Sequence, residues 1–210
     1  MFDLDGTLLD TLQGIADSVN LALNRLGFPQ HELEAYKYFV GDGREALAIR
    51  VLPEDHRDAI TFNRLVAYIN EEYCKCWSNN TRPYHGVPEM LQALTDLGIK
   101  MAILSNKPLD SAEEMVYRLL PQWHFELVVG AIPSVPKKPD PTAAIRIAEQ
   151  LEIPTTEFLY LGDSDVDMKT ATAADMYPVG ALWGFRTADE LLASGAKELI
   201  QNPVDLIRFL

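Results

Sequence analysis

Residues 1–10, "MFDLDGTLLD", place Asp3 and Asp5 two residues apart, where an apolar strand runs into a glycine turn. Two neighbouring carboxylates repel each other, so their pairing needs a compensating charge or a chemical role. Residues i and i+2 of an extended chain project to the same side, which would let both carboxylates face one ligand. The structural alternative is a plain turn, because Asp-Gly is a common turn pair and Asp5 directly precedes Gly6.

The composition is that of a folded protein without a general surface for polyanions. The 210 residues are 48% hydrophobic and 23% charged, which is typical of globular domains. The net charge of −13 argues against nucleic acids and anionic membranes as partners. No apolar run approaches the length of a membrane span and no signal region opens the chain, so we expect a cytoplasmic protein. A small anionic substrate remains compatible with this charge if local cations or a metal bind it.

Two kinds of pattern divide the chain. Residues 11–80 carry helical patterns without a convincing strand, and Gly27 ends the first of these helices. Strand-like and helical segments then alternate, with the strands at 99–105, 125–131, 157–162, 177–182 and 197–201. This alternation predicts a doubly wound parallel sheet, to which residues 1–4 add one short strand. The helical segment would then be an insertion after that strand, and we expect the natural chain to begin a few residues earlier.

The only cysteines, Cys74 and Cys76, lie one residue apart in a helical pattern. A disulfide there would be strained, and a zinc site would need more ligands nearby. We therefore expect two buried or half-buried thiols.

Polar residues collect where the predicted strands end. They are Asp3 and Asp5, Ser105 and Asn106, Lys138 in "KKPDP", and Asp163 and Asp167 in "GDSDVD". Ligands bind beyond the carboxyl ends of parallel strands, so four separated segments would meet at one rim. Each segment alone also fits a turn, a loop or a helix cap, as Ser164 and Asp167 fit a near capping box. Their coincidence on one rim favours a site.

This rim has the groups that phosphoryl transfer needs. A hard divalent cation would neutralise the crowded acids, and oxygen ligands suit Mg²⁺. Ser105 and Lys138 would add a hydroxyl donor and a fixed positive charge. Asp3 can then attack phosphorus to form an aspartyl phosphate, and Asp5 can protonate the leaving alkoxide and later deprotonate water.

The motifs "DLDGTLLDT", "LSNKP", "KKPDP" and "GDSDVDM", in this order and spacing, resemble the haloacid dehalogenase (HAD) superfamily on its phosphatase side. They span almost the whole chain. The resemblance implies an α/β fold with a Rossmann-like, doubly wound parallel sheet as its catalytic core, residues 1–12 and 83–210. It also implies an inserted all-helical cap domain of the C1 type, residues 13–82.

The resemblance gives the acids their roles. Asp3 would be the nucleophile and a metal ligand, and Asp5 the acid/base that lends its backbone carbonyl to the metal. Asp163 would ligate Mg²⁺, and Asp167 would support the metal shell.

The resemblance also implies a phosphate site. Ser105 and Lys138 would hold phosphoryl oxygens, and Asn106 would contribute its backbone. Lys137 is the neighbouring competitor, but "K-P-D-P" aligns the lysine of the family with Lys138. In the cap, "FVGDGREAL" offers Arg44, and we expect Arg44 or Lys37 to meet an anionic leaving group.

Other residues near these motifs have structural interpretations. Arg44 could instead be solvated beside a Gly-rich turn. His85, in the linker back to the core, could lie near the site, although a lone linker histidine is more often structural. Residues 183–185, "WGF", would pack in the core.

"SNKP" and the tail from Trp183 resemble phosphoglycolate phosphatase-type enzymes, and Asp5 disfavours a dehalogenase. We therefore expect a Mg²⁺-dependent phosphatase of a small phosphorylated metabolite, as a monomer or homodimer. Three alternatives remain: a sugar-phosphate mutase, a pyrophosphatase of the same superfamily, and a phospho-aspartate receiver-like module. The long helical insertion disfavours the receiver, which needs no lid.

Overall fold

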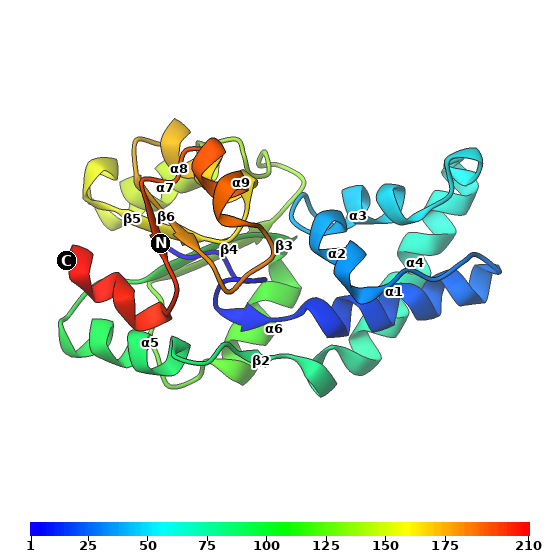
Figure 1. Ribbon diagram of the computed structural model, residues 1–210, viewed down its shortest axis with the longest axis horizontal. Helices are drawn as coiled ribbons and strands as arrows, with labels where there is room; N and C mark the ends of the chain where they lie inside the picture. The colour runs from blue at the N-terminus through cyan, green and yellow to red at the C-terminus, as the bar shows by residue number, and fades with distance from the viewer. The chain divides into compact units, whose positions relative to one another are not determined.

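The computed structural model describes residues 1–210, and the chain divides into two compact units (Figure 1). The first unit comprises Met1–Leu9 and Pro83–Leu210, and the second comprises Asp10–Arg82. An α/β unit interrupted by a helical segment is the fold class that the sequence predicts. The assignment of residues 13–82 as a functional cap stays a prediction.

The first unit is built on a parallel sheet whose centre is the beginning of the chain. Its strands are β3 (Ala102–Pro108), β4 (Leu127–Ala131), β5 (Leu159–Gly162), β6 (Tyr177–Ala181) and β7 (Glu198–Ile200). β3 pairs with β4, and β5, β6 and β7 pair in that order. Phe2 joins the two halves, since it bridges both Ile103 and Leu161 in parallel. Residues 1–3 thus lie between β3 and β5, which places Asp3 at the middle of the sheet.

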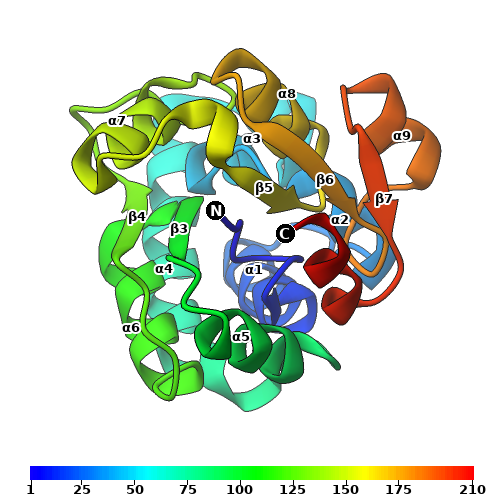
Figure 2. The same cartoon turned by 90° about the vertical axis from the view of Figure 1, so that its left-hand side faces the viewer.

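Helices cover both faces of this sheet. They are α5 (Val87–Asp96), α6 (Leu109–Leu119), α7 (Thr142–Leu151), α8 (Asp165–Ala173) and α9 (Ala188–Ala193), with 3-10 turns at Thr155–Glu157 and Pro203–Phe209. α5 and α6 lie on one face, and α7 and α8 lie on the other (Figures 1 and 2). The sheet is therefore doubly wound, as its alternating pattern indicates.

The core between the sheet and α7 is close-packed and apolar. Ala102 and Leu104 of β3 pack against Ala144 and Ile147 of α7, and all four are at most 2% exposed. A central parallel strand is covered on both faces, so it reads as a continuous apolar run. That run ends at Ser105, where the first polar group of β3 enters the site region.

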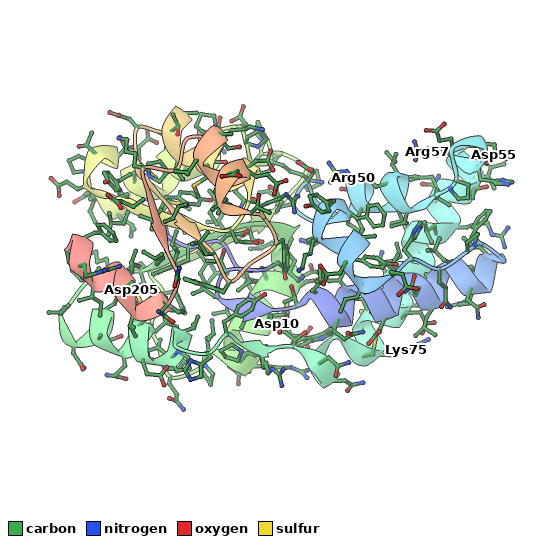
Figure 3. The ribbon with its side chains drawn as sticks, viewed as in Figure 1. Asp10, Arg50, Asp55, Arg57, Lys75 and Asp205 are labelled. Carbon is green, nitrogen blue, oxygen red and sulfur yellow. The ribbon has the colours of Figure 1, made fainter.

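The second unit is helical. Its helices are α1 (Leu12–Leu26), α2 (Leu33–Phe39), α3 (Arg44–Val51) and α4 (Ala59–Asn80), with a 3-10 turn at Glu54–His56. Gly27 ends α1 with a left-handed φ of 77°, a conformation that glycine adopts without steric cost. Asp58 begins α4, because its carboxylate accepts the N–H groups of Ile60 and Thr61. Charged side chains such as Asp55, Arg57 and Lys75 are exposed on this unit (Figure 3).

Three features of the structure differ from the expectations. β1 (Leu9–Asp10) pairs with β2 (Arg82–Pro83), and α2 forms, although neither has a clear sequence pattern. The prediction for the thiols is wrong for Cys74, which is exposed, whereas Cys76 is half-buried with its Sγ 3.2 Å from the Ser18 Oγ. Residues two apart on a helix project roughly 200° apart, so only one can face the neighbouring helix.

None of the helices combines the length and the apolar character that crossing a bilayer demands.

Candidate active site

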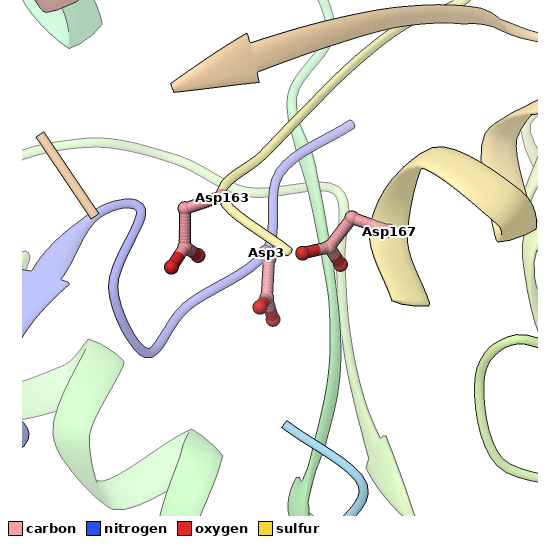
Figure 4. A group of neighbouring side chains, drawn as sticks. All are labelled: Asp3, Asp163 and Asp167. Atoms are coloured by element: carbon pink, nitrogen blue, oxygen red, sulfur yellow. The ribbon is translucent and has the colours of Figure 1, made fainter. Parts of the chain in front are cut away.

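Three buried carboxylates meet at the carboxyl end of the sheet. One oxygen from each of Asp3, Asp163 and Asp167 lies within 4.8 Å of the others, and Figure 4 shows the three side chains converging. Asp3 follows the central segment, Asp163 follows β5, and Asp167 lies in the first turn of α8. They are 8%, 1% and 0% exposed. The rim predicted from the strand ends therefore brings these three acids together.

The carboxylates are difficult to ionise together. Burial and the charge of Asp167 raise the pKa of Asp3 to about 7, although Lys138 opposes them. Burial, Asp167 and Asp3 also hold the pKa of Asp163 well above its ordinary value. Additional positive charge at this position would stabilise the ionised cluster.

Lys138 supplies part of that charge. Its Nζ lies 2.6 Å from the Oδ1 of Asp167 and 2.9 Å from the Oδ1 of Asp3, and it donates to the carbonyl of Leu104 at 2.9 Å. Burial alone would lower the pKa of Lys138, but Asp167 and Asp3 outweigh it and hold this pKa well above its ordinary value. Lys138 is thus a permanent cation that ties two acids together.

The side chain of Asn106 fixes the backbone of Lys138. Its Nδ2 donates to the Lys138 carbonyl at 3.0 Å, and its Oδ1 accepts the Lys138 N–H at 2.9 Å. These two bonds join the end of β3 to the "KKPDP" loop. Asn106 therefore positions the lysine through its side chain, in addition to any role of its backbone.

A tight cradle holds Asp163. Its Oδ1 accepts the hydroxyl of Thr7 at 2.8 Å, and its Oδ2 accepts the N–H of Phe185 at 2.8 Å. A Cβ on Gly6 would lie 2.3 Å from the Asp163 carboxylate, and a Cβ on Gly184 would lie 2.2 Å from the Cβ of Asp163. Both glycines are needed because Asp163 occupies the space that a side chain would fill.

Asp167 is held by Ser164, the N-cap residue of α8, and by Lys138. Its Oδ2 accepts the N–H and the hydroxyl of Ser164 in a capping box, and its Oδ1 faces Lys138. A Cβ on Gly162 would lie 2.3 Å from the Cβ of Asp167. Both oxygens of Asp167 are engaged by protein donors.

Asp5 stands apart from the three-carboxylate cluster and has its own cation. The Nζ of Lys107, in β3, lies 3.0 Å from both carboxylate oxygens of Asp5. The side chains of Lys107 and Asp5 are 7% and 12% exposed. Ser105 fixes the backbone of this lysine, since its Oγ accepts the Lys107 N–H at 3.2 Å.

The cluster fits a hard divalent cation. The Oδ1 of Asp3 is buried and faces the Lys138 Nζ at 2.9 Å as its ion-pair partner. The three side chains that converge here offer carboxylate oxygens as ligands. Mg²⁺ prefers such oxygen ligands, with one or two carboxylates and the remaining positions taken by water or substrate.

Several residues that shape the site were not predicted to do so. Lys107 lies inside the quoted "LSNKP" motif, but nothing in its sequence position pairs it with Asp5. Residues 183–185 were expected to pack in the core; Phe185 is indeed buried, yet its N–H also binds Asp163. The indole of Trp183 donates to the Thr7 carbonyl at 2.9 Å, which fixes the loop after β6 against the Asp3–Thr7 turn.

Three further residues considered from the sequence lie outside this cluster of contacts. Arg44 is half-buried at the start of α3, and Lys37 pairs with Glu34 at 2.8 Å, both in the second unit. His85 is exposed just before α5. A role for these residues at the site stays a prediction.

The chain matches known proteins over most of its length. Residues 1–181 match the family model of haloacid dehalogenase-like hydrolases. A phosphoglycolate phosphatase of Aquifex aeolicus is 29% identical over 100% of this chain and 95% of its own. One of Pseudomonas putida is 34% identical over 88% of this chain and 69% of its own, and one of Xanthomonas campestris is 31% identical over 98% and 93%.

Solved structures show the same fold. A haloacid dehalogenase-like family protein of Streptococcus pneumoniae superimposes with a TM-score of 0.88 at 20% identity, over 99% of this chain and 95% of its own. A hydrolase of Pseudomonas syringae gives a TM-score of 0.80 at 23% identity, over 99% and 94%. These likenesses concern the fold, whereas the family model covers the motifs that carry the buried acids. The chain therefore belongs to the haloacid dehalogenase-like hydrolases and is similar to their phosphoglycolate phosphatases.

Proposed function

We propose that this protein is a Mg²⁺-dependent phosphatase that hydrolyses a small phosphomonoester of the phosphoglycolate type through an aspartyl phosphate. The observation that carries this proposal is the buried Asp3, whose carboxylate lies beside Lys138 and two further acids. The relatives named phosphoglycolate phosphatase support the substrate class.

In the first half of the reaction, Asp3 is the nucleophile. One of its carboxylate oxygens forms a bond to phosphorus while the bond from phosphorus to the leaving oxygen breaks. Asp5 gives a proton to that leaving oxygen, which departs as an alcohol. Covalent capture divides one difficult displacement into two easier ones.

In the second half, Asp5 acts as the base. It takes a proton from a water molecule whose oxygen forms a bond to phosphorus, and the bond between phosphorus and Asp3 breaks. Inorganic phosphate leaves, and Asp3 and Asp5 return to their starting states. Asp5 can serve first as an acid and then as a base, because the first displacement takes its proton and the second returns one.

Lys138 and Ser105 would bind the phosphoryl group. Lys138 carries a fixed charge next to Asp3, and Ser105 is buried within β3. Fixed donors that face the transferred group stabilise the charge that develops on its oxygens. Asn106 would add its backbone N–H and would keep Lys138 in place.

Asp3 and Asp163 would hold the magnesium ion, with the backbone carbonyl of Asp5, while Asp167 supports them. When bound, the ion neutralises the carboxylates and polarises a phosphoryl oxygen. The cytoplasmic location and the state as a monomer or homodimer remain predictions.

The test is the release of inorganic phosphate from a panel of phosphoglycolate, pyrophosphate and sugar phosphates with added Mg²⁺. Asp3→Asn should abolish release from every compound, because an amide is not a nucleophile toward phosphorus. Asp165→Asn is the matched control from the "GDSDVDM" motif, since Asp165 forms only an outer ion pair with Lys169 and Arg186, and it should retain activity. Substantial turnover by Asp3→Asn would refute the nucleophile assignment.

Two further outcomes identify the alternatives. Isomerised sugar phosphate without phosphate release would indicate a mutase. A phosphorylated protein that persists for hours without turnover would indicate a receiver-like module.

A further inference from the structure

The ion pair between Lys107 and Asp5 blocks the residue that the proposed reaction needs most. The Lys107 Nζ bridges both Asp5 oxygens at 3.0 Å each, so it covers the oxygen edge of the carboxylate. As long as this bridge persists, that edge of Asp5 cannot face a leaving group. Movement of the lysine side chain on substrate binding would open this edge of Asp5 for proton exchange.

The lysine needs another anion when it moves. Its side chain is 7% exposed, so water alone would solvate the displaced ammonium group poorly. Its backbone is held by Ser105, so the movement is confined to the flexible side chain. A negative charge on the substrate would replace the one that Lys107 gives up.

The position of Lys107 indicates which part of the substrate carries that charge. Lys138 pairs with Asp3, where the phosphoryl group is attacked, whereas Lys107 pairs with Asp5, which serves the leaving oxygen. In the proposed reaction Lys138 would therefore serve the phosphoryl group, and Lys107 would serve the leaving group.

We infer that Lys107 determines specificity: it transfers from Asp5 to a carboxylate on the leaving group and thereby frees Asp5. This inference rests on the proposed function and deepens it, because it assigns the preferred substrates to phosphomonoesters with an anionic leaving group. A neutral leaving group offers Lys107 no replacement for Asp5. Such a substrate would be hydrolysed less efficiently.

Phosphoglycolate and ethyl phosphate provide the test, since they share a two-carbon leaving group and differ in the carboxylate. Lys107→Met should lower kcat/KM for phosphoglycolate by about 10- to 100-fold more than for ethyl phosphate, as expected for loss of a charged hydrogen bond. Lys107→Arg keeps a cation and should retain more of the preference than Lys107→Met. Lys100→Met is the matched control, because Lys100 is exposed two residues before β3 and should leave the ratio unchanged.

An equal loss for both compounds in folded Lys107→Met would overturn the inference, because the lysine would then only support Asp5. An unchanged ratio in Lys107→Met would overturn it as well. Circular dichroism of each variant establishes that it is folded.

Calorimetric titration of the two compounds separates this inference from the proposed function. Binding of phosphoglycolate that depends on Lys107, without phosphate release, would contradict the phosphatase and support the role of Lys107. Phosphate release from both compounds with no preference in the wild type would support the phosphatase and refute the role of Lys107. Absence of binding to either compound would refute both.

Discussion

Replacement of Lys138 by methionine tests whether one buried cation holds the acidic cluster together. Methionine has nearly the same length and removes only the charge and the hydrogen bonds. Lys138 is 4% exposed and lies 2.9 Å from Asp3 and 2.6 Å from Asp167. Its removal would leave two buried carboxylates without their cation.

The structure sets the size of the effect. Breaking a buried ion pair by removing one partner costs about 3–5 kcal/mol. In a protein of this size each kcal/mol corresponds to about 2–4 °C in Tm, so we expect a fall of roughly 6–20 °C. Protonation of Asp3 would relieve part of this loss, and the measurement therefore belongs at about pH 8, above the raised pKa of that group.

The assay is urea unfolding in EDTA, so that no metal replaces the missing charge. Tryptophan fluorescence and far-UV circular dichroism should be recorded together, because a chain with two units can unfold in more than one step. Lys169→Met is the matched control: it removes a lysine that pairs with Asp165 at 2.6 Å but is 53% exposed. An exposed pair contributes only about 0–1 kcal/mol.

A double variant isolates the pair itself. Lys138→Met leaves the Asp167 carboxylate without its cation, and Asp167→Asn removes that negative charge. The loss in free energy of unfolding of the double variant should therefore be smaller than the sum of the two single losses by about 1–3 kcal/mol. Loss of less than 1 kcal/mol in Lys138→Met, or additivity within about 0.5 kcal/mol, would refute the view that Lys138 compensates the acids.

The remaining predictions concern the metal, the cradle and the cap. Saturating Mg²⁺ at about 100 times its Kd should raise Tm by ~5–10 °C, and more at high than at low pH, because protons compete for Asp3 below its pKa of about 7. In metal-free protein the contribution of Asp3 to stability should fall as pH rises from 3.8 toward 7, since the folded state retains a proton that the unfolded state releases. Gly184→Ala should cost about 1–3 kcal/mol and weaken Mg²⁺ binding, because the new Cβ would lie 2.2 Å from the Cβ of Asp163. Arg44→Ala should weaken the binding of phosphoglycolate while hydrolysis of ethyl phosphate survives.

Each of these has a simple control. Differential scanning fluorimetry with Mg²⁺ and EDTA measures the metal effect, and an equal shift in Asp163→Asn would contradict the ligand assignment. A Gly98→Ala variant is no reference for Gly184→Ala, because Gly98 has a φ of 68° that strains any side chain. The reference for a backbone change away from the site is Ala193→Gly, because Ala193 is exposed at the end of α9. Equal losses for both substrates in Arg44→Ala would count against a role in binding the leaving group.

Local patterns in the sequence were enough to predict the fold class. The helical spacing before Gly27 and the alternation of strands and helices after residue 86 each depend on residues that are close in the chain. A central strand reads as an apolar run that ends in a polar residue, which is why Asp3 and Asp163 could be placed at strand ends. The same reasoning was wrong for Ser105, because β3 continues past it to Pro108. The capping pattern of Ser164 and Asp167 was equally visible.

The contacts that make these residues a site depend on the tertiary structure. Lys107 and Asp5 are 102 positions apart, and the N–H of Phe185 reaches Asp163 across 22 positions. No periodicity predicts such pairs, because each depends on the direction of one side chain or one amide after the sheet has formed. The sequence alone determined that acids and lysines gather at one edge of a parallel sheet, because strand ends follow from local patterns. The packing decided which lysine pairs with which acid, because that depends on side-chain directions.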